Sequence, residues 1–248
     1  MRGLTPDSQL EEYLGEVVER LARLVGERLL GAWVVGSGAL GDFDPQRSDV
    51  DVQAVASERL AREELEALAA ELSHPALECP VRGLEFVLYA RAGLTDPLGP
   101  AFQLNLNTGP GMRQHEGYDA AAEPRFWFVL DVAIARRQSR ALAGAAPAEL
   151  LPELPRELVL SSLRDALAWW RDHDATGAIL AACRAWVWME QGRWLSKGDA
   201  AAWAAERLDD PAPVQRALAH RADAAVPEPT AADVGRVVRT VQGMLPRG

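Results

Sequence analysis

The segment Ala32–Ala56 (AWVVGSGALGDFDPQRSDVDVQAVA) contains two patterns that together decide the fold. The apolar run Ala32–Val35 leads directly into glycines, which is typical of a buried strand that enters a tight turn. Residues 49–54 (DVDVQA) then alternate between polar and apolar side chains, and this period of two predicts a strand with one polar face. The segment therefore predicts two strands joined by a glycine-containing turn.

The glycines of this turn, Gly36, Gly38 and Gly41, also form a GxGxxG string. A dinucleotide-binding unit needs a helix after such glycines and a second strand at the end of about 30 residues. Here the next predicted strand begins only eight residues after Gly41. We therefore interpret the glycines as a turn whose backbone can approach a phosphate closely, with the hydroxyl group of Ser37 as a donor.

Two carboxylates stand on the polar face of the second predicted strand. Because Asp49 and Asp51 lie two residues apart, their side chains leave the same face with Cα atoms roughly 6–7 Å apart. Like charges at this spacing repel unless a cation lies between them, and Mg²⁺ binds carboxylate and phosphate oxygens together. The alternative is an exposed edge strand whose acids face water. The coincidence with the Gly36-Ser37 turn favours the metal site.

A third acid, Glu85, lies within the apolar segment 83–90 (GLEFVLYA), which we expect to be a further strand. An unpaired buried carboxylate is costly, so we expect Glu85 to face a cleft or a metal ion, where it could act as a base. The alternative is a glutamate near the strand end that reaches solvent.

The character of the chain changes near Phe126. Before it, the sequence predicts an amphipathic helix that begins near Leu10 and ends at Gly31, a helix over 57–72, and strands over 32–35, 49–54, 83–90 and 102–107. Beyond it, strand-like alternation stops, and Ala, Leu and Trp recur at helical spacing. The pattern predicts helices at about 156–172, 178–191, 197–208, 214–221 and 231–244.

The stretch 141–155 contains three prolines and is typical of a seam between two domains. We therefore expect an α/β (α+β) domain with a mixed sheet over residues 1–150. An all-α helical bundle domain is expected to follow over residues 151–248.

Composition limits the kinds of partner. Of the 248 residues, 48% are apolar and 25% are charged, which is enough for a substantial core. The formal net charge of −10 disfavours nucleic acid as a partner and suits a small polar or cationic molecule.

The two cysteines, Cys79 and Cys183, form no CxxC motif, so we expect buried, reduced thiols rather than a disulfide or a zinc site. No apolar run resembles a signal peptide or reaches the ~20 residues that a membrane helix needs. The sequence therefore predicts a soluble cytoplasmic protein with no membrane partner.

At these residues the chain resembles a known family. Gly36-Ser37, Ser48-Asp49-Val50-Asp51 and Glu85 resemble the signature of the nucleotidyltransferase superfamily of the polymerase beta type. Five further segments resemble the aminoglycoside adenylyltransferases that modify streptomycin and spectinomycin: 128–141 (FVLDVAIARRQSRA), 143–144 (AG), 182–186 (ACRAW), 196–197 (SK) and 203–208 (WAAERL). The resemblance extends from Gly36 to Leu208 with patchy identity.

This resemblance implies a nucleotidyltransferase domain that uses ATP and Mg²⁺. It implies that Asp49, Asp51 and Glu85 hold the metal, with Glu85 also serving as the general base. It further implies that Ser37 and Ser48 contact the ATP phosphates.

Two basic residues match the arginine and lysine with which the helical domain of this family reaches ATP. Arg184 lies inside the apolar run 178–188, where an unpaired guanidinium is costly and favours an anionic partner. Lys197 could equally be a surface lysine near the start of a helix.

The acceptor side departs from the family pattern. Where the family has an aromatic residue against streptomycin, this chain has a small residue near Gly109. Where the family has an aspartate followed three residues later by a histidine or asparagine, this chain has Asp174 and Gly177. Asp174 is expected either to receive an ammonium or hydroxyl group of the acceptor or to cap a helix. The other residues expected to line the acceptor pocket are Gln103, Asn105 and Asn107.

The sequence thus predicts transfer of AMP from ATP to a hydroxyl group of a small polar acceptor, with an aminoglycoside or aminocyclitol antibiotic such as spectinomycin or streptomycin favoured. In this hypothesis Glu85 takes the hydroxyl proton and pyrophosphate leaves. Two alternatives stay open. One is the same reaction on another metabolite or on a protein hydroxyl, and the other is a catalytically silent nucleotide-binding member of the fold.

Overall fold

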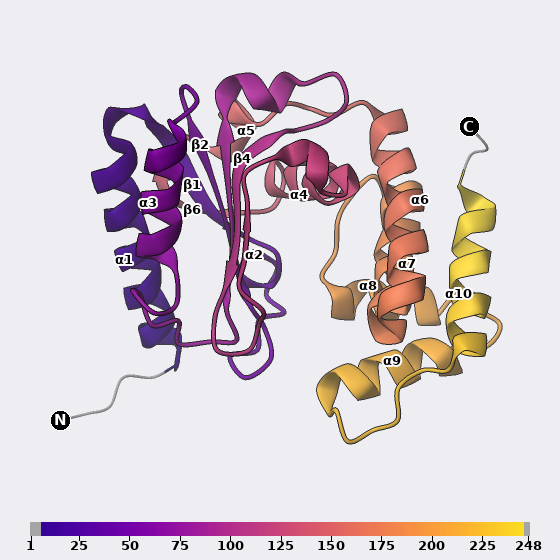
Figure 1. The fold of residues 1–248 in the computed structure, drawn as a ribbon. Helices are drawn as coiled ribbons and strands as arrows, with labels where there is room; N and C mark the ends of the chain where they lie inside the picture. The colour runs from indigo at the N-terminus through magenta and orange to yellow at the C-terminus, as the bar shows by residue number, and fades with distance from the viewer. Residues whose placement is uncertain (1–5, 246–248) are drawn as a thin grey trace. The chain divides into compact units, whose positions relative to one another are not determined.

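The computed structural model describes residues 6–245, and the chain divides into two units (Figure 1). Unit 1 extends to Leu154 and unit 2 begins at Pro155. The boundary expected from the sequence, after residue 150, lies a few residues earlier. Within the described residues, unit 1 has a mixed sheet with helices and unit 2 has helices alone, so the predicted fold class is confirmed.

Unit 1 is organised around a six-stranded sheet with the strand order β5-β4-β3-β2-β1-β6. Strands β2 and β3 pair in parallel, whereas the other neighbouring strands are antiparallel, which makes the sheet mixed. The strands are β1 (Leu29–Val35), β2 (Val50–Ala56), β3 (Leu84–Ala90), β4 (Phe102–Thr108), β5 (His115–Gly117) and β6 (Arg140–Gly144).

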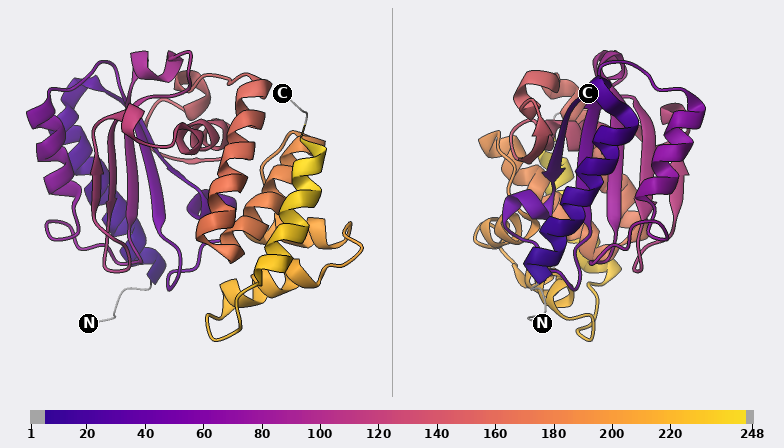
Figure 2. Two further views of the ribbon diagram at one scale, coloured as in Figure 1. Left: turned by 45° about the vertical axis from the view of Figure 1, so that its right-hand side comes forward. Right: turned by 90° about the vertical axis from the view of Figure 1, so that its left-hand side faces the viewer.

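One face of the sheet is covered by α1 (Pro6–Val25) and α3 (Arg62–Leu72), which lie together on that face in Figures 1 and 2. Alternate apolar residues of the strands point to these helices because successive strand side chains leave opposite faces. Val52, Phe86 and Leu106 belong to this core and are almost fully buried. Each fully buried apolar side chain of this size contributes about 1.5–3 kcal/mol to folding.

The opposite face packs against α4 (Arg125–Ala135) over only part of its area. Here Trp33 is completely buried, and the rings of Phe102 and Phe128 lie 4.6 Å apart. The indole nitrogen of Trp33 donates to the carbonyl oxygen of Ala145 at 3.0 Å, which secures the end of β6. Further along the same strands this face becomes polar, and there it carries the candidate active site.

Unit 1 differs from the sequence prediction in four main places, the first being that the helix predicted over 57–72 begins only at Arg62. The first helix ends at Val25, and Gly31 lies inside β1 at a bulge instead of ending the helix. The predicted seam between domains contains strand β6, which pairs with β1, so strand structure does not stop at Phe126. Strand β5 was not predicted at all. The short helices of this unit are η1 (Gly26–Arg28), α2 (Ser37–Leu40), η2 (Arg91–Thr95), η3 (Ala120–Ala122) and α5 (Pro147–Leu150).

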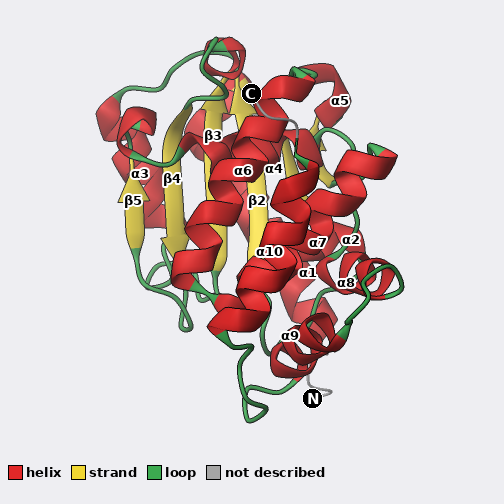
Figure 3. Cartoon of the chain, turned by 90° about the vertical axis from the view of Figure 1, so that its right-hand side faces the viewer, coloured by secondary structure: helices red, strands yellow, loops and turns green. Residues whose placement is uncertain are grey.

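Unit 2 is built from the helices that follow Pro155, and helices are drawn in red in Figure 3. Helix α7 contacts each of the other four, which explains why its sequence is apolar on nearly all sides. The predicted helices are all present, with small shifts at their ends. They are α6 (Arg156–His173), α7 (Ala175–Gln191), α8 (Lys197–Ala205), α9 (Ala212–Ala222) and α10 (Ala231–Met244).

Both cysteines are free and buried. Burial raises the pKa of the Cys183 thiol to about 12, so this group stays protonated at neutral pH. None of the helices within residues 6–245 combines the length and apolar character that a membrane-crossing helix needs.

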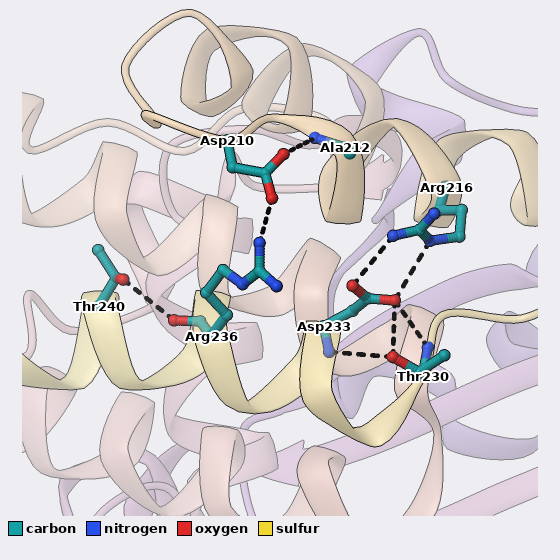
Figure 4. Close-up of polar contacts among 7 residues, drawn as sticks. All are labelled: Asp210, Ala212, Arg216, Thr230, Asp233, Arg236 and Thr240. Atoms are coloured by element: carbon teal, nitrogen blue, oxygen red, sulfur yellow. Dashed lines mark hydrogen bonds and ion pairs between the residues drawn. The ribbon is translucent and has the colours of Figure 1, made fainter.

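A buried carboxylate fastens α10 to α9 (Figure 4). Asp233 accepts from the backbone N–H of Thr230 at 3.0 Å and from its hydroxyl group at 2.8 Å. The guanidinium group of Arg216 donates to both carboxylate oxygens, at 3.0 and 3.2 Å. The backbone N–H of Thr230 and then Arg216 lower the pKa of Asp233 to about 2, because they stabilise its ionised form.

We predict that Asp233→Asn lowers the free energy of unfolding at pH 7 by about 1–3 kcal/mol, because it removes a charge that makes several hydrogen bonds. A carboxyl group whose pKa is lowered in the folded state stabilises folding above its unfolded pKa of about 4. That contribution is lost as the pH falls through about 2. Urea unfolding of both proteins at several pH values should therefore show a difference that shrinks below pH 4.

Asp210→Asn is the matched control. Asp210 also pairs with an arginine, Arg236, but its side chain is 45% exposed, so the loss should be below about 1 kcal/mol. Equal losses for the two variants would contradict the role assigned to Asp233.

Candidate active site

The turn after β1 places backbone against a carboxylate. Gly36 follows the strand with a φ angle of +61°, in the left-handed region that favours glycine. A Cβ atom at Gly36 would lie 2.0 Å from Oδ2 of Asp51. The glycine therefore allows the carboxylate of Asp51 to lie directly beside the turn.

Asp51 belongs to a row of residues that crosses five strands. Val35 of β1 pairs with Asp51, Asp51 with Glu85 of β3, Glu85 with Asn107 of β4, and Asn107 with His115 of β5. Neighbouring strands lie about 4.8 Å apart, so Asp51 and Glu85 are direct neighbours on one face. This is the same face that packs against α4. The residues directly before and after each of the two acids in its strand belong to the other face, which α1 and α3 cover. Two of the three predicted acids are therefore brought together.

The third acid, Asp49, is paired with a cation that the sequence did not reveal. Arg82 Nη1 donates to Asp49 Oδ2 at 3.0 Å, and the two side chains are 47% and 25% exposed. Across residues 6–245, no three His, Cys, Asp or Glu side chains are arranged to hold a metal ion. This differs from the predicted three-acid site, because Asp49 points to Arg82 while Asp51 and Glu85 are strand neighbours.

The two predicted phosphate-binding serines occupy different settings. Ser37 is half-buried at the first residue of α2. The hydroxyl oxygen of Ser48 accepts from the backbone N–H of Asp44 at 3.0 Å, and Ser48 is buried. Ser48 therefore closes the turn that leads into β2, and this structural role was not predicted.

The three polar residues of β4 have separate roles. Gln103 is fully buried, and its Oε1 accepts from the backbone N–H of Leu60 at 2.8 Å. This position gives Gln103 a structural role instead of the predicted contact with an acceptor. Asn105 donates to Oε2 of Glu123 at 2.6 Å, whereas Asn107 is half-buried beside Glu85. Of the three, Asn107 lies in the same row as Asp51 and Glu85.

The loop after β4 explains the absence of an aromatic residue there. Gly109 has a φ angle of +156°, and a Cβ atom at this position would lie 2.2 Å from Cα of Gly83. The backbone N–H of Gly111 donates to the carbonyl oxygen of Arg82 at 2.8 Å. The loop thus lies against the backbone before β3, and no side chain fits at Gly109.

In unit 2, a hydrogen bond links one of the two predicted ATP-binding cations to the segment just before the other. Arg184 of α7 donates through Nε to the carbonyl oxygen of Leu195 at 3.0 Å, two residues before Lys197. Lys197 is exposed at the first residue of α8. The ring of Trp194 lies 5.9 Å from the Arg184 guanidinium group and was not identified from the sequence.

Asp174 caps a helix. Its Oδ1 accepts from the backbone N–H of Gly177 at 2.8 Å, at the start of α7. A Cβ atom at Gly177 would lie 2.5 Å from the ring of Trp170, which explains why a larger residue is absent. Arg184 lies ten residues further along α7, about 15 Å along the helix axis, so Asp174 and Arg184 are not brought together.

We predict that Gly109→Ala lowers the free energy of unfolding by more than about 2 kcal/mol, because the new Cβ atom meets backbone that cannot rotate away. The control is Gly26→Ala. Gly26 also has a positive φ angle, +64°, but a Cβ atom there would have nothing within 4 Å, so the loss should be about 1 kcal/mol. Urea unfolding measures both variants, and equal losses would show that the loop does not rest on Gly83.

Comparisons with known proteins identify a matching family model, similar sequences and a similar structure. Residues 149–246 match the family model described as aminoglycoside adenylyltransferase, C-terminal domain. The aminoglycoside (3'') (9) adenylyltransferases of Shigella flexneri and Escherichia coli are each 27% identical over 214 residues, which cover 81% of this chain and 80% of theirs.

The fold is also found in a solved protein. The crystal structure of spectinomycin adenyltransferase AAD(9) from Enterococcus faecialis with ATP and spectinomycin is 19% identical and covers 94% of this chain and 99% of that chain. Its TM-score of 0.73 supports the same fold for both. On these findings the chain is similar to aminoglycoside adenylyltransferases, in sequence over residues 149–246 and over most of its length at 27% identity, and it shares the fold of a solved adenyltransferase.

Proposed function

We propose that the protein is a Mg²⁺-dependent adenylyltransferase that moves AMP from ATP to a hydroxyl group of an aminoglycoside or aminocyclitol antibiotic such as spectinomycin or streptomycin, and so confers resistance. The observation that carries this proposal is the register pair of Asp51 and Glu85, placed beside the Gly36 turn. The names of the relatives supply the acceptor class, and nothing in the comparisons favours the two alternatives.

The reaction assigns roles to Glu85 and to the turn that contains Gly36 and Ser37. Glu85 takes the proton of the acceptor hydroxyl group, whose oxygen then forms a bond to the α-phosphorus of ATP. The bond from that phosphorus to the bridging oxygen breaks, and pyrophosphate leaves. Ser37 and the turn at Gly36 are proposed to bind phosphate oxygens, since glycine lets the backbone come close.

The acids fit Mg²⁺ in kind, because Asp51 and Glu85 present carboxylate oxygens side by side on neighbouring strands. Mg²⁺ bound to them would neutralise negative charge on the phosphate oxygens. Asp49 can join this site through Oδ1, since Arg82 contacts only its Oδ2.

Arg184 and Lys197 are proposed to bind the ATP phosphates from unit 2. Their support is the contact of Arg184 with the α7–α8 connection, which keeps both cations at one end of α8. A cytoplasmic location and the exclusion of nucleic acid as a partner stay predictions.

Pyrophosphate release from ATP and Mg²⁺, measured over a panel of aminoglycoside and aminocyclitol acceptors, tests this function. The wild-type protein should release pyrophosphate only with an accepted antibiotic. Glu85→Gln keeps the shape of the side chain and removes the base, so turnover should fall by roughly 10² to 10⁴ while ATP still binds.

ATP affinity measured by calorimetry serves as the control for Glu85→Gln. If affinity and turnover fell together, Glu85 would act chiefly as a metal ligand. If the wild-type protein released no pyrophosphate with any acceptor, the proposed function would be wrong.

A further inference from the structure

A fourth carboxylate lies on the same sheet face as Asp51 and Glu85. Glu123 precedes α4, and its Oε2 accepts from Nδ2 of Asn105 at 2.6 Å. Its Oε1 lies 3.0 Å from Nε2 of His115. Since an ionised carboxylate only accepts, the proton lies on the histidine nitrogen.

Glu123 is held close to the sheet. Its side chain is only 16% exposed. A Cβ atom at Gly117 of β5 would lie 1.9 Å from Oε1 of Glu123, so the glycine makes room for this carboxylate. Asn105 pairs in register with Gly117, so both residues meet Glu123 at one place on the sheet.

The position of this group relates it to the candidate active site. His115 belongs to the row of Asp51, Glu85 and Asn107, and Asn105 belongs to the next row on the same face. With strands about 4.8 Å apart, these partners of Glu123 lie about 5–10 Å from Glu85 across the sheet. A small acceptor that presents a hydroxyl group to Glu85 can therefore also reach Glu123.

The hydrogen bonds of Glu123 leave room for one more donor. Each carboxylate oxygen can accept two hydrogen bonds, and from residues 6–245 each oxygen of Glu123 receives one. Asn105 is neutral, and His115 offsets the negative charge only when both of its ring nitrogens are protonated. An ammonium group of a bound molecule is a compact cation with several donors, so it would offset the negative charge of Glu123.

We infer that Glu123 receives an ammonium group of the acceptor and is a specificity-determining residue of the proposed transfer. Asn105 and His115 are then positioning residues that hold the carboxylate, and Asn105 does not itself contact the acceptor. This inference rests on the proposed function and adds the chemical feature by which the acceptor is chosen.

The test uses spectinomycin and the same molecule with its amino groups acetylated. Glu123→Gln keeps the size of the side chain and one acceptor oxygen for Asn105 but removes the charge. Calorimetry with a non-hydrolysable ATP analogue should show spectinomycin affinity falling about 10- to 100-fold. In kinetics the KM for spectinomycin should rise by a similar factor, while kcat and the KM for ATP change little. Acetylated spectinomycin should bind both proteins equally weakly.

Glu116→Gln is the matched control. Glu116 lies on the same strand as His115, is exposed, and accepts from Tyr118 at 2.9 Å. The substitution Glu116→Gln removes one negative charge from the same region, and the affinity for spectinomycin should stay at the wild-type value.

Two results would overturn the inference, and they can be told apart from failure of the proposed function. If Glu123→Gln bound spectinomycin as the wild type does, or lost affinity equally for both forms of the acceptor, Glu123 would be structural while the transfer reaction stood. If the wild-type protein neither bound nor modified spectinomycin or any acceptor of the panel, the proposed function would fail, and this inference with it.

Discussion

The parallel pairing of β2 with β3 is the constraint on which the candidate site depends. Among the described strands it is the only parallel pair, and its register places Asp51 beside Glu85 at the second residue of each strand. Parallel neighbours need a crossover connection, and α3 supplies it while covering the opposite face of the sheet. The same helix therefore buries the apolar side of the strands and brings two like charges together on the other side. Two carboxylates placed side by side in this way can hold a divalent cation between them, which is why the row is interpreted as a binding site and not as part of the core.

Glycine at two positions decides which groups can approach this row. At Gly36 the missing side chain is what allows the turn to lie against Asp51. At Gly109 the loop after β4 comes so close to Gly83 that an aromatic residue cannot be placed there. The acceptor side of the site must therefore recognise its ligand by other groups than an indole at this loop. We infer that Glu123, held by Asn105 and His115 at the β4–β5 edge, is one of the groups that recognise the acceptor.

Local patterns predicted much of this fold. The alternation in residues 49–54 and the apolar segment 83–90 indicated the central strands, and helical spacing indicated the helices of unit 2 with small errors at their ends. Strand β6 was missed because residues 140–144 are short, rich in alanine and exposed at an edge, so their strand structure comes from pairing with β1. Strand β5 has three residues and offers no measurable period. The pairing of Asp49 with Arg82 and of Glu123 with Asn105 joins residues distant in sequence, and no local pattern reveals it. The sequence left both readings of Asp174 open, and the helix cap is the one that the structure displays.

Asp51 and Glu85 are proposed to form together a metal-dependent site for the transfer of AMP. The most direct measurement is a crystal structure of the protein with Mn²⁺ in place of Mg²⁺ and a non-hydrolysable ATP analogue, with the metal located by its anomalous scattering. We expect an anomalous peak about 2.1 Å from a carboxylate oxygen of Asp51, with an α-phosphate oxygen as a further ligand and Glu85 beside it. A nucleotide whose phosphates lie away from Gly36 and Ser37, or a metal bound elsewhere with none at Asp51, would contradict this proposal.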